Sequence, residues 1–415
     1  MKPHLLTMLL MVLTARSVCL AQKTPTPTPT PTSGSSGGAT SSPVPSPPVD
    51  YNSLQRLMDE ERMNTPEPDA KPATIAEVEK TLADNRRSGD GKLAAILTKL
   101  TLTERANAAR LSRWNSESPG AQTRQALLAL AGGSAFLPLP AEDIPAAPAP
   151  SIAEQRRMIT AFAKFLSGTL PGLPNFRATR LTTYFEDRPP RQLALATDPA
   201  ATDPLRNRPM HVVGTSRLQV AYVEGREVAA RYSGFEDPTL YASRFTTAGE
   251  FGPILYGVMM DAVQNKLVWA GWESSADGPL AVFRFDAAKQ KSHYSLKAPG
   301  AAKLQSQFVA YRGRIAIRPS DGAIVRLSVV ASPASDDALA EADIAVEYGR
   351  VEIGQRFYTC PVHGVALSKV PLHAARGAKQ DQATALQTQL NDVSFQQYHV
   401  FRGDLHITQG IPAQP

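Results

Sequence analysis

The sequence predicts an α+β protein in which a small helical region precedes an antiparallel β-sheet that contains one inserted helix. Three observations lead to this prediction. Apolar residues recur at helical spacing through residues 51–133, and the period changes to two near Leu173. The gaps between the later strands are too short for the crossover helices of a parallel sheet. The first observation predicts the helices, the second the strands and the third their antiparallel pairing.

Residues 1–21 have the pattern of a secretory signal peptide. Lys2 supplies a short basic segment, an apolar run extends from Leu5 to Leu13, and small residues end at Ala21. This run is well short of the roughly 20 apolar residues that a spanning helix needs. We therefore expect cleavage after Ala21, export to the periplasm or the extracellular space, and no integral membrane segment in the mature chain.

Two proline-rich segments divide the remaining chain. Residues 22–50 contain no aromatic residue, no Leu and no Ile, so they cannot bury enough apolar surface to offset chain entropy. We expect them to form a disordered Pro/Thr/Ser linker. Residues 134–150 form a Pro/Ala-rich connector, but its Phe136 and Ile144 predict that it lies against a surface.

The helical region spans residues 51–133. Thr74 and Glu77 form a capping box, and the helix that follows carries Ile75, Val78 and Leu82 on one face. Several further apolar groups at helical spacing predict additional short helices in this region: Tyr51, Leu54, Leu57 and Met58; Leu93, Ile96, Leu97 and Leu100; Ala108, Leu111 and Trp114; Leu127, Leu128 and Ala131.

Residues 151–410 are predicted to form one helix followed by the sheet. Ser151 and Glu154 make a second capping box, for a helix that ends near Gly168. A third capping box, Thr247 to Glu250, opens a helix between two hairpins, which predicts a lid or plug on the sheet. Alternating residue types predict the strands, at 175–186, 218–223, 228–232, 266–272, 280–285, 292–296, 307–317, 323–330, 344–353, 365–370 and 393–407.

Aromatic residues stand out at one set of alternating strand positions. They are Trp269, Phe283, Phe285 and Tyr311. Because alternate residues of a strand face the same side of a sheet, we expect these rings to share one face. They form either the core beneath the predicted helices or the lining of an apolar cavity, and in the second case they are the ligand-binding residues.

The charge balance argues against a nucleic-acid partner. The chain has 44 Lys and Arg against 38 Asp and Glu, and removal of residues 1–21 lowers the formal net charge from +6 to +4. A nucleic-acid surface needs basic residues massed together with stacking aromatics, and no such segment occurs in the sequence.

Sequence motifs for catalysis or cofactor binding are absent. The chain has no G-x-S-x-G, H-E-x-x-H, P-loop, G-x-G-x-x-G or S-x-x-K, so we expect no catalytic residue and no cofactor. Cys360, His363 and His373 have the residue types of a metal site, but a closed zinc site needs four ligands and no second pair has matching spacing. We therefore expect no metal, and a buried Cys360 next to a surface His363.

Several segments together resemble a family of uncharacterised secreted proteins from acidobacterial genomes. The resemblance spans most of residues 120–407 and implies export, but it names no activity. The matching segments are Phe136-Leu-Pro-Leu-Pro, Ile144-Pro, Thr169-Leu-Pro-Gly-Leu-Pro-Asn-Phe-Arg-Ala-Thr-Arg, Gly249-Glu-Phe-Gly252, Ala310-Tyr-Arg-Gly313, Ser320-Asp-Gly-Ala-Ile-Val-Arg326, Val346-Glu-Tyr-Gly349 and Phe395-Gln-Gln-Tyr-His-Val-Phe401.

The order of hairpin, helix and hairpin is also remotely similar to the half-barrel of LolA-type lipoprotein carriers and of the sensor RseB. This similarity implies a curved antiparallel sheet with a lid helix, and a lipid or lipoprotein segment as partner. We therefore expect an exported, non-enzymatic envelope protein that binds an acyl chain, a lipid or an apolar peptide segment in a concave sheet. Two alternatives stay open: a structural or interaction module of the cell envelope with no small ligand, and a hydrolase without a local signature.

Overall fold

The computed structural model describes residues 69–169, 172–187, 208–223, 226–229, 253–264, 266–297, 306–332, 341–371 and 386–400. These residues all belong to one of the two units into which the chain divides, Leu57–Pro415. The predicted signal peptide, linker, first helical stripe, third capping box and His373 lie outside the described residues. Within the described residues, no helix is long and apolar enough to cross a membrane.

The described part of the helical region, residues 69–133, contains four helices, and their ends follow the expected chemistry. At the first of them, the Thr74 hydroxyl accepts a hydrogen bond from the Glu77 amide while the Glu77 carboxylate accepts one from the Thr74 amide, which confirms the capping box. Ile75, Val78 and Leu97 contribute to a small core of their own with Trp114. The helices are α3 (Ile75–Asp84), α4 (Asp90–Thr98), α5 (Ala108–Glu117) and α6 (Ala121–Gly133).

One short element of this region differs from the prediction. Leu100 does not continue a helix, because it begins strand β2 (Leu100–Leu102), which pairs in parallel with β1 (Lys71–Ala73). Helix α4 ends at Thr98, and the carbonyl of the next residue, Lys99, accepts a hydrogen bond from the Lys71 amide. Periodicity alone assigned Leu100 to a helix because three apolar residues of α4 precede it at helical spacing.

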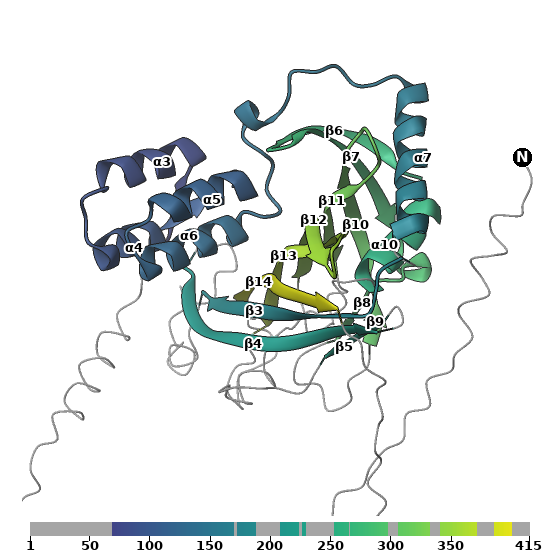
Figure 1. The fold of residues 1–415 in the computed structure, drawn as a ribbon. Helices are drawn as coiled ribbons and strands as arrows, with labels where there is room; N and C mark the ends of the chain where they lie inside the picture. Colours follow the sequence, from purple (N-terminus) through teal and green to yellow (C-terminus); the bar gives the residue numbers. More distant parts are fainter. Residues whose placement is uncertain are drawn as a thin grey trace, which may run out of the picture. The chain divides into compact units, whose positions relative to one another are not determined.

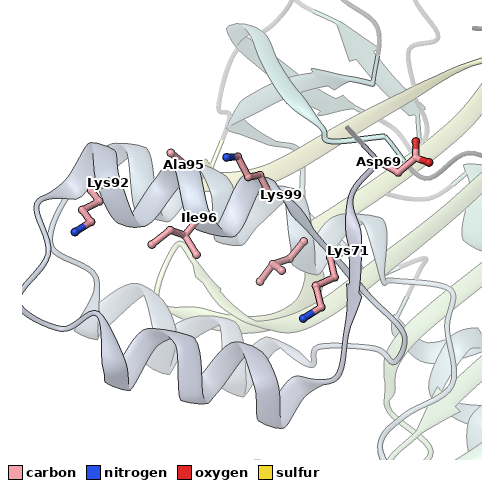
Figure 2. Close-up of a pocket in the computed structure, with 7 residues that line it drawn as sticks. Asp69, Lys71, Lys92, Ala95, Ile96 and Lys99 are labelled. Atoms are coloured by element: carbon pink, nitrogen blue, oxygen red, sulfur yellow. The ribbon is translucent and has the colours of Figure 1, made fainter. Parts of the chain in front are cut away.

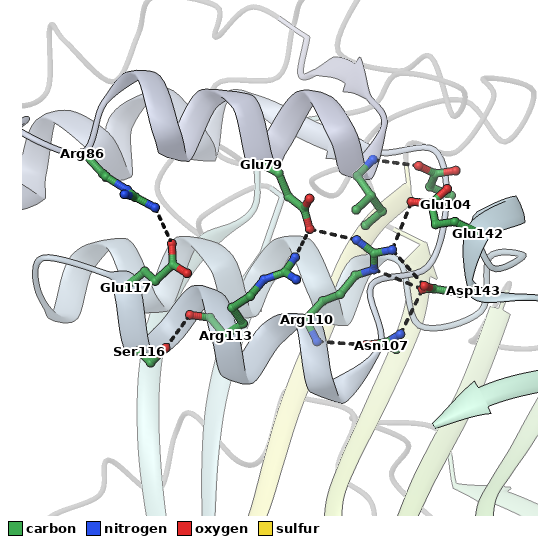
Figure 3. A network of polar contacts seen from close by, with 11 residues as sticks. Glu79, Arg86, Glu104, Asn107, Arg110, Arg113, Ser116, Glu117, Glu142 and Asp143 are labelled. Atoms are coloured by element: carbon green, nitrogen blue, oxygen red, sulfur yellow. Dashed lines mark hydrogen bonds and ion pairs between the residues drawn. The ribbon is translucent and has the colours of Figure 1, made fainter. Parts of the chain in front are cut away.

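Ion pairs attach the connector to the helical region, as Figure 3 shows. The connector contains a short 3-10 helix, η2 (Ala141–Asp143). Arg110 Nη2 of α5 lies 2.8 Å from Asp143 Oδ1, and Arg110 Nη1 lies 2.8 Å from Glu79 Oε1 of α3. The hydrogen bonds that Arg110 donates to Asp143, followed by the charges of Asp143 and Glu79, raise the pKa of the Arg110 guanidinium. The connector therefore lies against the helices, as Phe136 and Ile144 predicted, although Ile144 itself is exposed.

The main sheet is antiparallel and has ten strands in the order β5-β4-β3-β14-β13-β12-β11-β10-β7-β6. It is open, with β5 and β6 at its two edges, and is not strongly curled. Two other strands, β8 (Ser295–Lys297) and β9 (Ser306–Phe308), form a separate two-stranded sheet. The ten strands are β3 (Phe176–Glu186), β4 (His211–Val223), β5 (Arg226–Ala229), β6 (Val268–Ser275), β7 (Gly278–Ala287), β10 (Ala310–Ile317), β11 (Ile324–Ser332), β12 (Glu341–Ile353), β13 (Arg356–Pro371) and β14 (Leu386–Val400).

The strand order is not the simple meander that the short gaps predicted. Strands β10 to β14 are neighbours in chain order, but β14 then pairs with β3, far back in the sequence. The chain crosses from one edge strand, β5, to the other, β6, by way of α10 (Pro253–Gln264). Pairing between distant strands leaves no trace in local periodicity, so the sequence could not predict this position of β14.

Two helices cover one face of the sheet, which we call the helix face. Helix α7 (Ile152–Thr169) places Phe162 on this face, and α10 places Val258 there, in one cluster with the strands of the β6 end of the sheet. Figure 1 shows α7 and α10 together near β6 and β7. The predicted turn at Gly322 packs against α7 so closely that a Cβ there would lie 2.3 Å from the backbone of Ala161. Only glycine fits this contact, and its φ of 73° also favours glycine.

The opposite face of the sheet contacts the helical region. Ala129 of α6 packs in one cluster with Phe185, Val365 and Leu390, from three neighbouring strands. A Cβ added at Gly132 would lie 3.1 Å from Leu390, so α6 approaches this strand closely. We call this side the ionic face, because the charged cluster described below also lies on it.

Candidate functional site

Three of the four rings predicted to bind a ligand belong to the filled core of the helix face. Phe283, Phe285 and Tyr311 expose 3% of their surface or less, and Trp269 is half-buried at their edge. The Trp269 and Phe283 rings meet edge to face with centroids 5.6 Å apart, and Phe285 and Tyr311 do so at 5.8 Å. The structure therefore brings the four residues onto one face, as expected, with their rings in two contacting pairs.

A fifth ring, Trp272, joins this cluster and was not predicted. It meets Trp269 with centroids 4.9 Å apart. Residues three apart on a regular strand face opposite sides, but a β-bulge at Gly271, whose φ is 137°, shifts the register between them. The signal in the sequence was the glycine between the two tryptophans, because an isolated glycine within a strand pattern often indicates a bulge.

A buried carboxylate lies at the boundary of this aromatic core. Asp261 of α10 has no exposed surface. Its Oδ2 accepts hydrogen bonds from the Tyr311 hydroxyl at 2.6 Å and from the His293 amide at 2.9 Å, and its Oδ1 lies 2.5 Å from His293 Nδ1. We call this group of Asp261, His293 and Tyr311 the latch, because it joins α10 to the sheet.

The latch has two chemical consequences. Burial, followed by the hydrogen bond and the negative charge of Asp261, raises the pKa of Tyr311, so its hydroxyl stays protonated and donates. The carboxylate also fixes the His293 imidazole through Nδ1, while 47% of that side chain is exposed. The signal for Asp261 in the sequence was an acid on the apolar stripe of the predicted helix, three residues after Val258.

A second group of charged residues lies on the ionic face. Glu273 of β6 contacts Arg326 Nη2 through both of its oxygens at 2.8 Å, and contacts Arg105 Nη2 of the helical region at 2.7 Å. Near them, His363 Nε2 lies 2.8 Å from Asp392 Oδ2, and His363 Nδ1 lies 3.5 Å from Glu347 Oε2. We call these six residues the ionic cluster: Arg105, Glu273, Arg326, Glu347, His363 and Asp392.

The charges of the ionic cluster balance one another. Burial disfavours the imidazolium of His363, but the charge and hydrogen bond of Asp392, followed by those of Glu347, outweigh it and raise the pKa of His363 well above 6.5. Burial likewise opposes ionisation of Glu273, yet Arg326 and Arg105 lower its pKa. Burial and the charge of Arg326 lower the pKa of Arg105 to about 10. Arg105, Arg326 and the protonated His363 therefore balance three carboxylates, and the formal net charge of the cluster is zero. The ion pair between Arg105 and Glu273 attaches the helical region to the sheet.

The cysteine and histidine considered as metal ligands do not converge. Cys360 is buried in a cluster with Val393 and Phe395, and burial raises the pKa of its thiol to about 12. His363 instead bonds Asp392, which is next to Val393 on β14 and therefore faces the other side of the sheet. Cys360 is buried as predicted, but it lies inside β13, at a position between two predicted strands, and His363 is held between carboxylates rather than at the surface. Among the described residues, no group of three His, Cys, Asp or Glu could hold a metal ion.

Comparisons with known proteins identify no relative. No family model matches the sequence, and no curated protein or solved structure matches it significantly. The function must therefore be argued from the helix face, the latch and the surface of this chain.

Proposed function

We propose that the protein is an exported, non-enzymatic protein of the cell envelope that binds an apolar chain between its sheet and helices α7 and α10. The ligand would be an acyl chain, a lipid or an apolar peptide segment. We further propose that its fold is a flatter relative of the LolA-type half-barrel, with α10 as the lid. The open antiparallel sheet and the helix inserted between its two edge strands support this relationship.

One observation carries the proposal: the margin of the aromatic core is apolar and only half-buried. On or next to α7, α10 and edge strand β6, six large apolar side chains pack on the core without being fully covered. A ligand that enters here would exchange contact with water for contact with the core, which is favourable in proportion to the apolar area removed from water. These side chains are Ile159, Phe165, Met259, Leu267, Trp269 and Trp272.

The way α10 is attached also supports the proposal. Its apolar contacts with the sheet are non-directional, so they allow small displacements, whereas the latch fixes the helix at Asp261. A ligand that extends from Trp269 toward Phe283 and Phe285 would have to shift α10 away from the rings. The latch would then act as the pivot of this movement.

Tryptophan fluorescence provides the test, because the chain has only three tryptophans. Trp269 and Trp272 lie at the proposed entrance, while Trp114 is buried in the helical region. A fatty acid brominated in the middle of its chain should quench the Trp114→Phe variant. The matched Trp269→Phe/Trp272→Phe variant retains Trp114, and the brominated acid should not change its fluorescence intensity.

Two outcomes would contradict the proposal. Equal quenching of both variants would mean that the acid partitions onto the protein without a site. An absence of quenching in the Trp114→Phe variant up to the solubility limit of the acid would favour the alternative of an interaction module without a small ligand.

The latch favours one rival function, a hydrolase without a local signature. A buried carboxylate that holds Nδ1 of an exposed histidine is the arrangement of a general base, in which Nε2 accepts a proton from water. That water would form the new bond to an ester carbonyl, and the proton would pass to the departing alcohol. In the part of the chain that the structure describes, no serine, threonine or cysteine side chain hydrogen-bonds His293.

An ester assay separates the rival from the main proposal. We expect p-nitrophenyl butyrate hydrolysis by the wild type to equal that of the His293→Gln variant. A rate at least tenfold higher in the wild type, with unchanged quenching by the brominated acid, would establish the hydrolase.

A further inference from the structure

The helical region has a groove that lies outside the sites described above. It runs between β1 and α4 and has a volume of about 530 Å³, within the range of ligand sites. Figure 2 shows Lys92, Ala95, Ile96 and Lys99 along α4, with Lys71 on the neighbouring strand. Leu100 and Asp69 complete its lining.

The chain geometry explains why three lysines meet at this groove. Lys92 and Lys99 are seven residues apart, which places them on one side of α4 with Ala95 and Ile96 between them. The hydrogen bond from the Lys71 amide to the Lys99 carbonyl brings the third lysine alongside. The amphipathic character of the groove is therefore built by α4 and by the parallel pair of β1, which precedes it, and β2, which follows it.

The groove combines a positive rim with an apolar floor. Ile96 and Leu100 are half-buried and Ala95 is exposed, while all three lysines are exposed. No lysine of the groove has an ion-pair partner within the described residues, and Asp69 is the one acid that lines it, so the lining has an excess of two positive charges. Lysine stems can lie along such a floor while their amines stay in water.

We propose that this groove docks the protein on a membrane surface that contains anionic lipids. The lysine amines would contact lipid headgroups, and Ile96 and Leu100 would contact the first carbons of the acyl chains. Charge complementarity argues for this occupant, because an anion relieves the mutual repulsion of the three amines. Each lysine near an anionic surface strengthens binding by roughly fivefold.

This inference does not rest on the proposed function, because it concerns a different part of the molecule. Its test is co-sedimentation of the full chain with phosphatidylcholine vesicles, with and without phosphatidylglycerol. We expect binding only with phosphatidylglycerol, and a weakening of that binding from about 0.01 M to about 0.15 M salt, as the Debye length falls from about 30 Å to about 8 Å.

Variants of equal net charge locate the docking surface. The Lys71→Gln/Lys92→Gln/Lys99→Gln variant should lose about a hundredfold in vesicle affinity, since it removes three contributions of about fivefold each. The matched control, Lys80→Gln/Lys164→Gln/Lys291→Gln, removes three exposed lysines elsewhere and should lose less than about fivefold. Ala95→Asp, which adds a negative charge at an exposed helical position of the groove, should weaken binding without loss of the folded state.

Three results would overturn the inference. The first is an equal loss in both triple variants, which would mean a general effect of net charge. The second is no binding to phosphatidylglycerol vesicles at low salt. The third is release from vesicles by millimolar inorganic phosphate or by a soluble short-chain phosphatidylglycerol, since either would assign the groove to free anions rather than to a membrane surface.

Discussion

The two faces of the ten-stranded sheet meet helices in different ways. On the helix face, α7 and α10 pack on aromatic and aliphatic side chains, with the latch as a localised polar contact. On the ionic face, the helical region is attached by apolar contacts of α6 and by Arg105 in the ionic cluster. Apolar contacts tolerate displacement, whereas ion pairs with short distances fix an orientation. We therefore expect the helix face to open more easily than the ionic face.

Among the changes that test this comparison, loss of a core ring on the helix face should lower the free energy of unfolding the most. Phe283→Ala removes a ring with 1% exposure and should lower the free energy of unfolding by about 4 kcal/mol, because the helices cannot fully collapse into the cavity. Denaturant unfolding measures this loss. Phe357→Ala is the control, because Phe357 is 55% exposed, and it should cost well under 1 kcal/mol. Similar losses for both would show that the helix face is not the main core.

Removal of the central carboxylate of the ionic cluster should have the next largest effect. Glu273→Ala leaves Arg105 and Arg326 buried without their partner, so we expect a loss of about 3 kcal/mol. The matched control is Glu117→Ala, which breaks the exposed pair with Arg86 and should cost less than about 0.5 kcal/mol. If Glu273→Ala costs no more than the control, the ionic face does not fix the helical region.

The latch should contribute less to the free energy of unfolding than Glu273, the central carboxylate of the ionic cluster. Tyr311→Phe removes one hydrogen bond to a charged group and should cost about 2 kcal/mol. A double-mutant cycle with Asp261→Asn should show that the two changes are not additive. Additive losses would mean that the two side chains do not act together in holding α10.

The stability that His363 contributes through the ionic cluster should fall as the pH rises. Because the pKa of His363 is raised, its pairing stabilises the folded state fully below the unfolded pKa of about 6.5, and this contribution is lost as the pH rises through the folded pKa. The free energy of unfolding of the wild type should therefore approach that of His363→Gln with rising pH. Asp392→Asn should weaken this dependence. A difference between wild type and His363→Gln that does not change with pH would contradict the assigned pairing.

The smallest effect is expected at the thiol. Cys360→Ser replaces a buried small hydrophobic group with a hydroxyl and should cost about 1 kcal/mol, without a change in quenching by the brominated acid. The raised pKa of the thiol, about 12, also predicts slow alkylation of the folded protein at neutral pH. Rapid alkylation under native conditions would show that β13 opens readily around Cys360.

Local chemistry made part of this structure predictable. The capping boxes at Thr74 and Ser151 fix helix starts through hydrogen bonds between residues three apart, so they are visible in sequence. The shared face of Trp269, Phe283 and Tyr311 was predictable because side chains alternate along a strand. Trp272 was missed because the bulge at Gly271 interrupts that alternation.

Contacts between distant segments were not predictable in the same way. Asp261 and His293 are 32 residues apart, and Arg105 and Glu273 are 168 residues apart. Nothing in the local pattern of either residue indicates its partner, because each pairing depends on where whole helices and strands pack. The latch and the ionic cluster therefore appeared only in the structure. The groove between β1 and α4 differs from them, because the residues that line it lie on elements that are close together in the sequence.

The position of β14 has a consequence for how the chain folds. Gln387 of β14 and Glu186 of β3 bond each other across 201 residues, and β14 joins β3 and β4 to the rest of the sheet. Two groups of strands therefore stay separate until β14 has been synthesised. High contact order of this kind slows folding. A chain that has been synthesised only as far as β13 therefore lacks the strand that joins β3 and β4 to the rest of the sheet, so this sheet cannot be completed while the segments before it are already available for folding.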